Sequence, residues 1–123
     1  MAISDFTTAD RWVVATALTE RYGKAIEIEP ADSEIKLDPG APEVTVCPTL
    51  YWAERGVEFV IFKIGESRYR SQFYYSTFEQ FSTGRDFDDL AECVTTTLRL
   101  QADHEKDRAG AASGKTGADL RPS

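Results

Sequence analysis

The fold is decided by the stretch VEFVIFKI (57–64), GE (65–66) and SRYRSQFYYS (67–76). Val, Ile, Phe and Tyr dominate both arms, as half-buried strands require. Gly65 at the first turn position favours a two-residue hairpin loop, because glycine takes a positive φ there without strain. The stretch therefore predicts a β-hairpin in which residues 57–64 pair with residues 67–76.

A two-residue loop at positions 65 and 66 decides which side chains of the hairpin share a face. The face predicted to meet the core carries Val60, Phe62, Ile64, Tyr69, Phe73 and Tyr75. The opposite face carries Val57, Phe59, Ile61 and Lys63 against Arg68, Arg70, Gln72 and Tyr74. Because Phe59, Ile61 and Tyr74 are too apolar for open solvent, either another part of the chain covers them or they form a partner or dimer surface.

The chain before the hairpin begins with a helix. Thr7 and Asp10 have the spacing of a capping box, and an apolar stripe predicts a helix from about Thr8 to Tyr22. Gly23 is the expected stop, since glycine is common just past a helix end.

Strands are expected between this helix and the hairpin. Alternation of apolar and acidic residues predicts strands at 25–29 and 33–37, with a turn at 30–32. A further strand is expected over 43–53. Pro48 marks a bulge, a bend or an edge in it, because proline cannot donate a ladder hydrogen bond.

Helical patterns return after the hairpin. Residues 78–81 predict one helical turn, and Asp86 is the predicted cap of a long helix whose apolar stripe stops after Ala102. The Gly-, Ala- and Ser-rich residues 109–123 predict a disordered tail. We therefore expect a single α+β domain over residues 1–108. It has an N-terminal helix, a meandering antiparallel sheet of about five strands, and a C-terminal helix packed on one face.

Composition limits the possible functions. The chain has 123 residues and a net charge of −7, which argues against direct nucleic-acid binding and against an anionic membrane surface. The N-terminus lacks the features of a signal peptide, and no apolar run approaches membrane-spanning length. With only two cysteines, expected to be buried free thiols, the sequence predicts a cytoplasmic protein.

Catalytic and metal-binding patterns are weak. His104 lies near the predicted frayed end of the last helix and is expected to be exposed and idle. Cys47 and Cys93 lack the close spacing of metal ligands. Glu58 is the one carboxylate predicted on the core face, at a strand start where a rim position is favoured over a catalytic one. We therefore predict no catalytic residue, no metal and no cofactor.

Charge patterning predicts where a partner would bind. Residues 24–43 carry mostly acids, which form a field able to steer a basic partner or simply keep the protein soluble. The cations near the hairpin either hold a carboxylate or phosphate of a partner or pair with the protein's own acids; they are Arg55, Lys63, Arg68, Arg70 and Arg85.

The function predicted is that of a non-enzymatic, acidic protein-binding module: an inhibitor, an immunity protein or an adaptor. An acidic inhibitor that mimics nucleic acid, such as an anti-CRISPR protein, belongs to this class. The residues predicted to contact the partner are Glu27, Glu29, Glu34, Phe59, Ile61, Arg68, Arg70 and Tyr74. A homodimer through the hairpin is a further possibility. The alternative is a small-molecule-binding or catalytic domain with a pocket between sheet and helices, lined by Tyr51, Trp52, Tyr69 and Tyr75.

Overall fold

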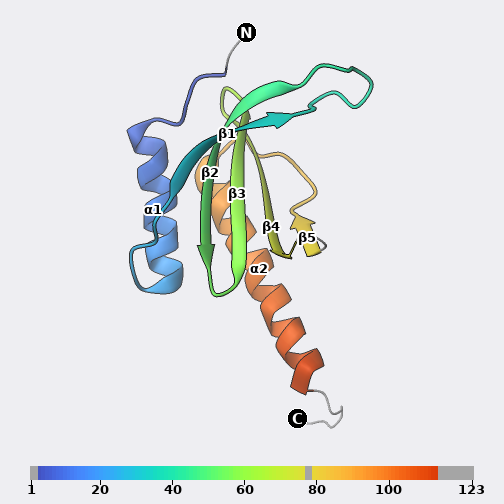
Figure 1. Ribbon diagram of the computed structural model, residues 1–123. Coiled ribbons are helices and arrows are strands. Elements are labelled where there is room, and N and C mark those ends of the chain that lie inside the picture. Colours follow the sequence, from blue (N-terminus) through green and yellow to red (C-terminus); the bar gives the residue numbers. More distant parts are fainter. Residues whose placement is uncertain (1–2, 77–78, 114–123) are drawn as a thin grey trace.

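The computed structural model describes residues 3–76 and 79–113 and shows a five-stranded antiparallel sheet with helices on one face (Figure 1). The helices are α1 (Thr8–Tyr22) and α2 (Leu90–Ser113). The strands are β1 (Glu29–Ile35), β2 (Thr45–Glu54), β3 (Val57–Gly65), β4 (Arg68–Ser76) and β5 (Glu79–Ser82). They lie side by side in chain order, so the sheet is a meander and the predicted α+β architecture is confirmed.

Helix α1 starts and stops where the sequence predicts. The Asp10 N–H donates to Thr7 Oγ1 at 3.0 Å, and the Thr7 N–H donates back to Asp10 Oδ2 at 2.9 Å. Gly23 takes φ 75° and donates its N–H to the Thr19 carbonyl at 2.8 Å. This left-handed conformation favours glycine and ends the helix.

Helix α2 starts later than predicted and ends later. Asp89, and not Asp86, caps it: Asp89 Oδ1 accepts from the Ala91 N–H at 3.0 Å. Asp86 is withdrawn from the helix because it binds Arg70. The prediction of disorder from residue 109 is wrong for residues 109–113, where α2 continues to Ser113 and alanines favour the helix. The rest of the predicted tail lies outside the described residues.

The hairpin forms, but its predicted register is wrong by one residue. Gly65 pairs with Arg68, so Glu66 and Ser67 make the loop, and the register shifts between Lys63 and Gly65. Ser67, at φ 54°, supplies the left-handed conformation that the prediction gave to glycine. Strand β3 is therefore turned over relative to the prediction, and Val57, Phe59, Ile61 and Lys63 face the helices.

Two other segments differ from the predictions. Residues 29–35 form one continuous strand, where two strands and a turn were predicted. Pro30 is tolerated there because β1 is an edge strand, where a missing N–H need not break a ladder on both sides. Residues 79–82 form strand β5 where a helical turn was predicted. Phe81 pairs with Phe73 of β4, which draws the segment into the sheet.

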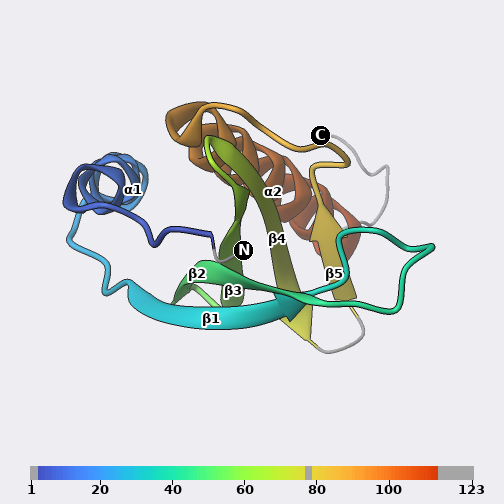
Figure 2. The same cartoon turned by 90° about the horizontal axis from the view of Figure 1, so that it is seen from above.

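The core lies between the sheet and the two helices. Its buried residues come from every layer: Phe6, Val14, Leu18, Leu50, Trp52, Val57, Phe59, Ile61, Tyr69, Phe73, Phe87, Leu90, Cys93, Val94 and Leu98. A buried polar contact joins the layers where the Ser71 and Thr97 hydroxyls meet. The helices therefore cover one face of the sheet, and the other face, here called the outer face, has no helix over it (Figure 2).

The chain itself covers one half of the outer face. Figure 2 shows β1 and the loop after it running across the side of the sheet that faces away from the helices. Cys47, Thr49 and Phe62 point to this side, yet they are only 0%, 3% and 8% exposed. Pro48 lies between Cys47 and Thr49, where a missing ladder donor permits a bend. This half of the outer face is therefore buried within the protein itself.

Candidate functional site

The structure corrects the predicted partner surface at two positions. Phe59 and Ile61 are 0% exposed and lie in the core, because the register shift turns β3 over. Their prediction as partner-contacting residues is therefore wrong, and of the two predicted alternatives the one in which the chain itself covers them holds.

The other predicted partner residues keep access to solvent. Glu27, Glu29 and Glu34 are exposed, and so is Arg68, while Arg70 and Tyr74 are half-buried on the outer face. The structure brings Glu29 and Tyr74 onto the same half of that face, whereas Glu34 lies toward the other end of β1.

The cations near the hairpin contact carboxylates or aromatic rings of the same chain. Arg70 donates to both carboxylate oxygens of Asp86, at 2.9 and 3.3 Å, and Arg68 reaches the same carboxylate at 3.5 Å. The hydrogen bond from Arg70 lowers the pKa of Asp86. Arg85 pairs with Glu92 at 3.2 Å and lies over the Phe87 ring, and Arg55 lies over the Tyr22 ring. Of the two predicted roles for these cations, pairing with the protein's own acids is found for Lys63, Arg68, Arg70 and Arg85, whereas Arg55 contacts a ring.

The acids of the β1 region are not matched in this way. Glu27, Glu29, Asp32 and Glu34 are all exposed, and neither an ion pair nor a side-chain hydrogen bond joins them to other described residues. No Lys or Arg occurs between Lys24 and Lys36. This edge of the sheet therefore carries a run of negative charges that the described residues do not balance.

The uncovered half of the outer face combines acids with tyrosines. Strand pairing places Glu29, Tyr51, Val60 and Gln72 in one row across the sheet, and Ala53, Glu58, Tyr74 and Gln80 in the next row. Neither row contains a Lys or Arg. We call the central members of the two rows the acidic tyrosine patch: Glu29, Tyr51, Glu58, Val60, Gln72 and Tyr74. All but Glu29, which is exposed, are half-buried.

A short hydrogen bond organises this patch. The Tyr51 hydroxyl donates to Glu58 Oε1 at 2.7 Å. That bond, with burial and the negative charges of Glu58 and Glu29, raises the pKa of Tyr51 to about 12. Burial, followed by the charge of Glu58, raises the pKa of Tyr74 as well. Both phenols are therefore neutral at physiological pH, and the charge of the patch resides on Glu29 and Glu58.

A hollow of about 350 Å³ adjoins the patch and shares Glu29 and Tyr51 with it. Its other walls are residues 24–27 and the end of β2 from Trp52 to Glu54. Lys24 pairs with Glu54 at 3.0 Å, so Glu27 and Glu29 are the unbalanced charges of the hollow. Trp52 is 1% exposed, and its Nε1 has no acceptor among the described residues.

The aromatic pocket of the alternative hypothesis does not form as predicted. Trp52 and Tyr69 belong to the packed core, and Tyr75 accepts a hydrogen bond from Gln101 beside it. Tyr51 lies on the opposite face of the sheet. The four residues therefore do not line one cavity.

His104 is placed differently from its prediction. It is half-buried, and its ring lies 4.3 Å from the Phe81 ring and 5.4 Å from the Phe73 ring. The expectation of an exposed histidine is wrong, because β5 brings Phe81 beneath α2. The contacts are those of a packing residue.

Both cysteines are free and buried. Burial raises the pKa of Cys93 to about 11, and burial also raises the pKa of Cys47. Neither thiol has the thiolate character of a nucleophile. Among residues 3–76 and 79–113, no three His, Cys, Asp or Glu side chains gather as metal ligands.

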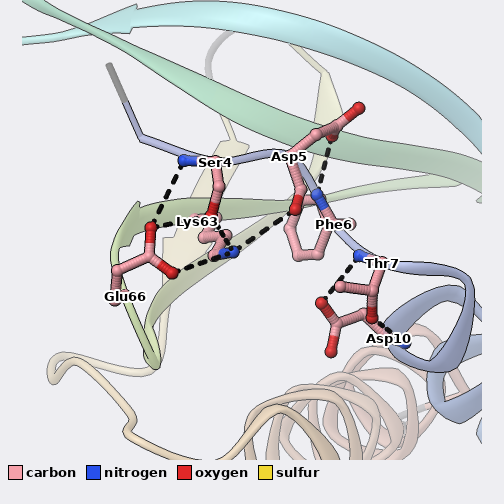
Figure 3. Close-up of polar contacts among 7 residues, drawn as sticks. All are labelled: Ser4, Asp5, Phe6, Thr7, Asp10, Lys63 and Glu66. Carbon is pink, nitrogen blue, oxygen red and sulfur yellow. Dashed lines mark hydrogen bonds and ion pairs between the residues drawn. The ribbon is translucent and has the colours of Figure 1, made fainter. Parts of the chain in front are cut away.

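Lys63 is a buried cation that the sequence did not reveal. It is 4% exposed, and its Nζ lies 3.1 Å from Ser4 Oγ, 3.3 Å from the Asp5 carbonyl oxygen and 3.6 Å from Glu66 Oε1 (Figure 3). Three acceptors match the three N–H groups of an ammonium, whereas a catalytic base would be a neutral amine. Ser4 Oγ donates to Glu66 at 2.7 Å, so its proton is directed away from Lys63. The pair is a structural contact.

Comparison with protein-family models, with curated proteins and with solved structures finds no match to this chain. Over the described residues, neither helix is both long and apolar enough to cross a bilayer. Function is therefore inferred from the geometry and charge of the chain itself.

Sequence reasoning missed Tyr51 and Glu58 as members of one surface. Tyr51 lies between Leu50 and Trp52, both core residues, so strand alternation could have placed it outside. Glu58 needed the correct hairpin register, which the turn alone did not reveal.

Proposed function

We propose that this chain is a non-enzymatic protein-binding module that covers a basic surface on a partner protein. An inhibitor of a nucleic-acid-binding protein, of the kind that anti-CRISPR proteins represent, belongs to this class, because nucleic-acid-binding surfaces are basic. Free, buried cysteines fit a reducing compartment such as the cytoplasm.

One observation carries the proposal. The cations near the hairpin are matched by groups of the chain itself, whereas the acids from Glu27 to Glu34 have no such partners. Unpaired charges of one sign along a sheet edge raise the encounter rate with a surface of the opposite sign and disfavour like-charged surfaces. A basic protein surface is therefore the complementary partner.

The test uses charge reversals that are matched in number. Glu27, Glu29 and Glu34 are changed together to Lys, and the control changes Glu20, Asp88 and Asp103 together to Lys. The control residues are exposed acids of α1, of α2 and of the segment before α2. Both variants have the same net charge, so only the position of the acids differs.

The partner is obtained by retention on the immobilised chain, and its binding rates are then measured by surface plasmon resonance over a range of salt concentrations. The β1-region variant should lose about tenfold in association rate at low salt, and the difference should shrink as salt screens it. The control should change far less. Equal loss in both variants, or no loss in either, would contradict the proposal.

A further inference from the structure

We propose that the acidic tyrosine patch is the seat of one arginine side chain of the partner protein. The inference rests on the proposed function and deepens it, since it names the group that is recognised and the residues that recognise it.

The patch suits a cation because its two rows carry negative charges and contain no positively charged side chain. Glu29 and Glu58 supply two carboxylates, and no Lys or Arg stands at any position of either row. The cation in the neighbouring row is Arg70, which pairs with Phe62 across the strands and is held away by both oxygens of Asp86. None of the residues in these rows, and no unbound cation in the neighbouring row, therefore neutralises the patch.

The tyrosines favour arginine over lysine. Tyr51 and Tyr74 present half-buried phenol rings on either side of Glu58, which is the cross-strand neighbour of Tyr74 and the hydrogen-bond acceptor of Tyr51. A planar guanidinium stacks on an aromatic ring and donates to a carboxylate at the same time. An ammonium is compact and more strongly hydrated, so it gains less from this arrangement.

The fixed geometry of the patch favours a specific binding site for an arginine side chain. The bond from Tyr51 to Glu58 Oε1 holds the carboxylate before any ligand arrives, and Glu58 Oε2 has no hydrogen-bond partner among the described residues. The aliphatic part of an arginine would lie near Val60, which is half-buried in the first row between Tyr51 and Gln72. Preorganised groups reduce the entropy lost on binding.

A second copy of this chain is a poorer occupant. Another outer face would bring Glu29 and Glu58 against acids, and like charges across an interface disfavour association. Arg68 and Arg70, which share the face of β4 that carries Gln72 and Tyr74, are already bound to Asp86.

The experiment follows backbone amide shifts of the ¹⁵N-labelled full chain by nuclear magnetic resonance. Three probes are titrated: N-acetyl-arginine methylamide, N-acetyl-lysine methylamide and N-acetyl-citrulline methylamide. Citrulline has nearly the shape of arginine without its charge. The arginine probe should give saturable shifts centred on the six residues of the patch, the lysine probe should bind about threefold more weakly, and citrulline should give no saturable shift.

Two variants complete the test. Glu58→Gln should weaken the arginine probe about threefold or more, whereas Glu34→Gln, which removes an exposed acid outside the patch, should leave it nearly unchanged. Tyr74→Leu serves as a second variant that removes only a ring and should likewise weaken the arginine probe. Amide spectra and melting temperatures of each variant identify any loss of fold.

Three results would overturn the seat: equal shifts from arginine and citrulline, shifts that spread evenly over the acids without saturation, or equal binding by Glu58→Gln and wild type. The proposed function is tested separately by the reversals at Glu27, Glu29 and Glu34. If those weaken partner binding while Glu58→Gln and Tyr74→Leu do not, the protein-binding role stands and the arginine seat fails.

Discussion

Lys63 Nζ lies 3.1 Å from the Oγ of Ser4, a residue 59 positions earlier in the chain. This contact ties the segment before α1 to the end of β3 and closes the core at that end (Figure 3). Phe6 follows two residues after Ser4, is 5% exposed, and stacks on Tyr69 with 6.2 Å between ring centres. Residues 4–6 are therefore part of the folded domain.

Replacing Phe6 by Ala should lower the free energy of unfolding by about 3 kcal/mol, because a buried ring is removed and a cavity remains. Trp12 provides an aromatic control: it is 67% exposed, and Trp12→Ala should cost less than about 0.5 kcal/mol. Chemical denaturation measures both. Similar losses for the two variants would show that the segment does not seal the core.

Tyr51 should titrate near pH 12 in the native protein and lower in Glu58→Gln, since the hydrogen bond to the Glu58 carboxylate holds the proton on the phenol. A folded pKa raised above the unfolded value of about 10 stabilises the fold fully below pH 10. That contribution is lost as pH rises through about 12. The ¹³Cζ shift of Tyr51 followed against pH reports its titration. Identical curves in wild type and Glu58→Gln would refute the contact.

His104→Ala should destabilise the protein by about 1 kcal/mol, because the ring is packed edge-on between Phe73 and Phe81. His104→Phe should retain most of the stability, since it keeps a ring in the same place. Lys106→Ala, two residues further along α2 and exposed, is the control. If thermal melting shows no difference between His104→Ala and Lys106→Ala, the aromatic packing contributes nothing.

The two thiols should resist alkylation in the native protein. Cys93 is 0% exposed, and with its pKa near 11 about one molecule in a thousand is a thiolate at pH 8. Cys47 is also 0% exposed, and burial raises its pKa. Mass spectrometry after iodoacetamide treatment should find neither residue labelled until denaturant is added. Rapid native labelling of Cys47 would contradict its burial in the folded protein.

Local signals explain which elements the sequence predicts correctly. Helix α1 follows from a capping box, an apolar stripe and a terminal glycine, all of which act within a few residues. The structure of the remaining elements depends on pairing between strands that lie apart in the sequence. Residues 29–35 carry turn-forming residues such as Pro30 and Asp32, yet β2 provides a continuous ladder for them. Residues 79–82 become a strand because Phe81 meets Phe73.

The hairpin register shows why the candidate site was harder to predict. Residues 57–64 are apolar on both faces, so alternation does not distinguish the core side from the outer side. The position of the loop then decides, and a shift of one residue moves Phe59 and Ile61 inward and Glu58 outward. The acids of β1 needed no register to be recognised, because exposed carboxylates occupy both of its faces.

The acidic edge of β1 also bears on how these molecules behave when crowded together. An unpaired strand edge is a template on which further strands can assemble into fibres. When two copies approach through β1, Glu29, Asp32 and Glu34 meet the same carboxylates, and repulsion keeps the edges apart. Because the Debye length falls to about 3 Å at 1 M salt, concentrated salt weakens this protection. The same charges that suit a basic partner thus act against aggregation in dilute buffer.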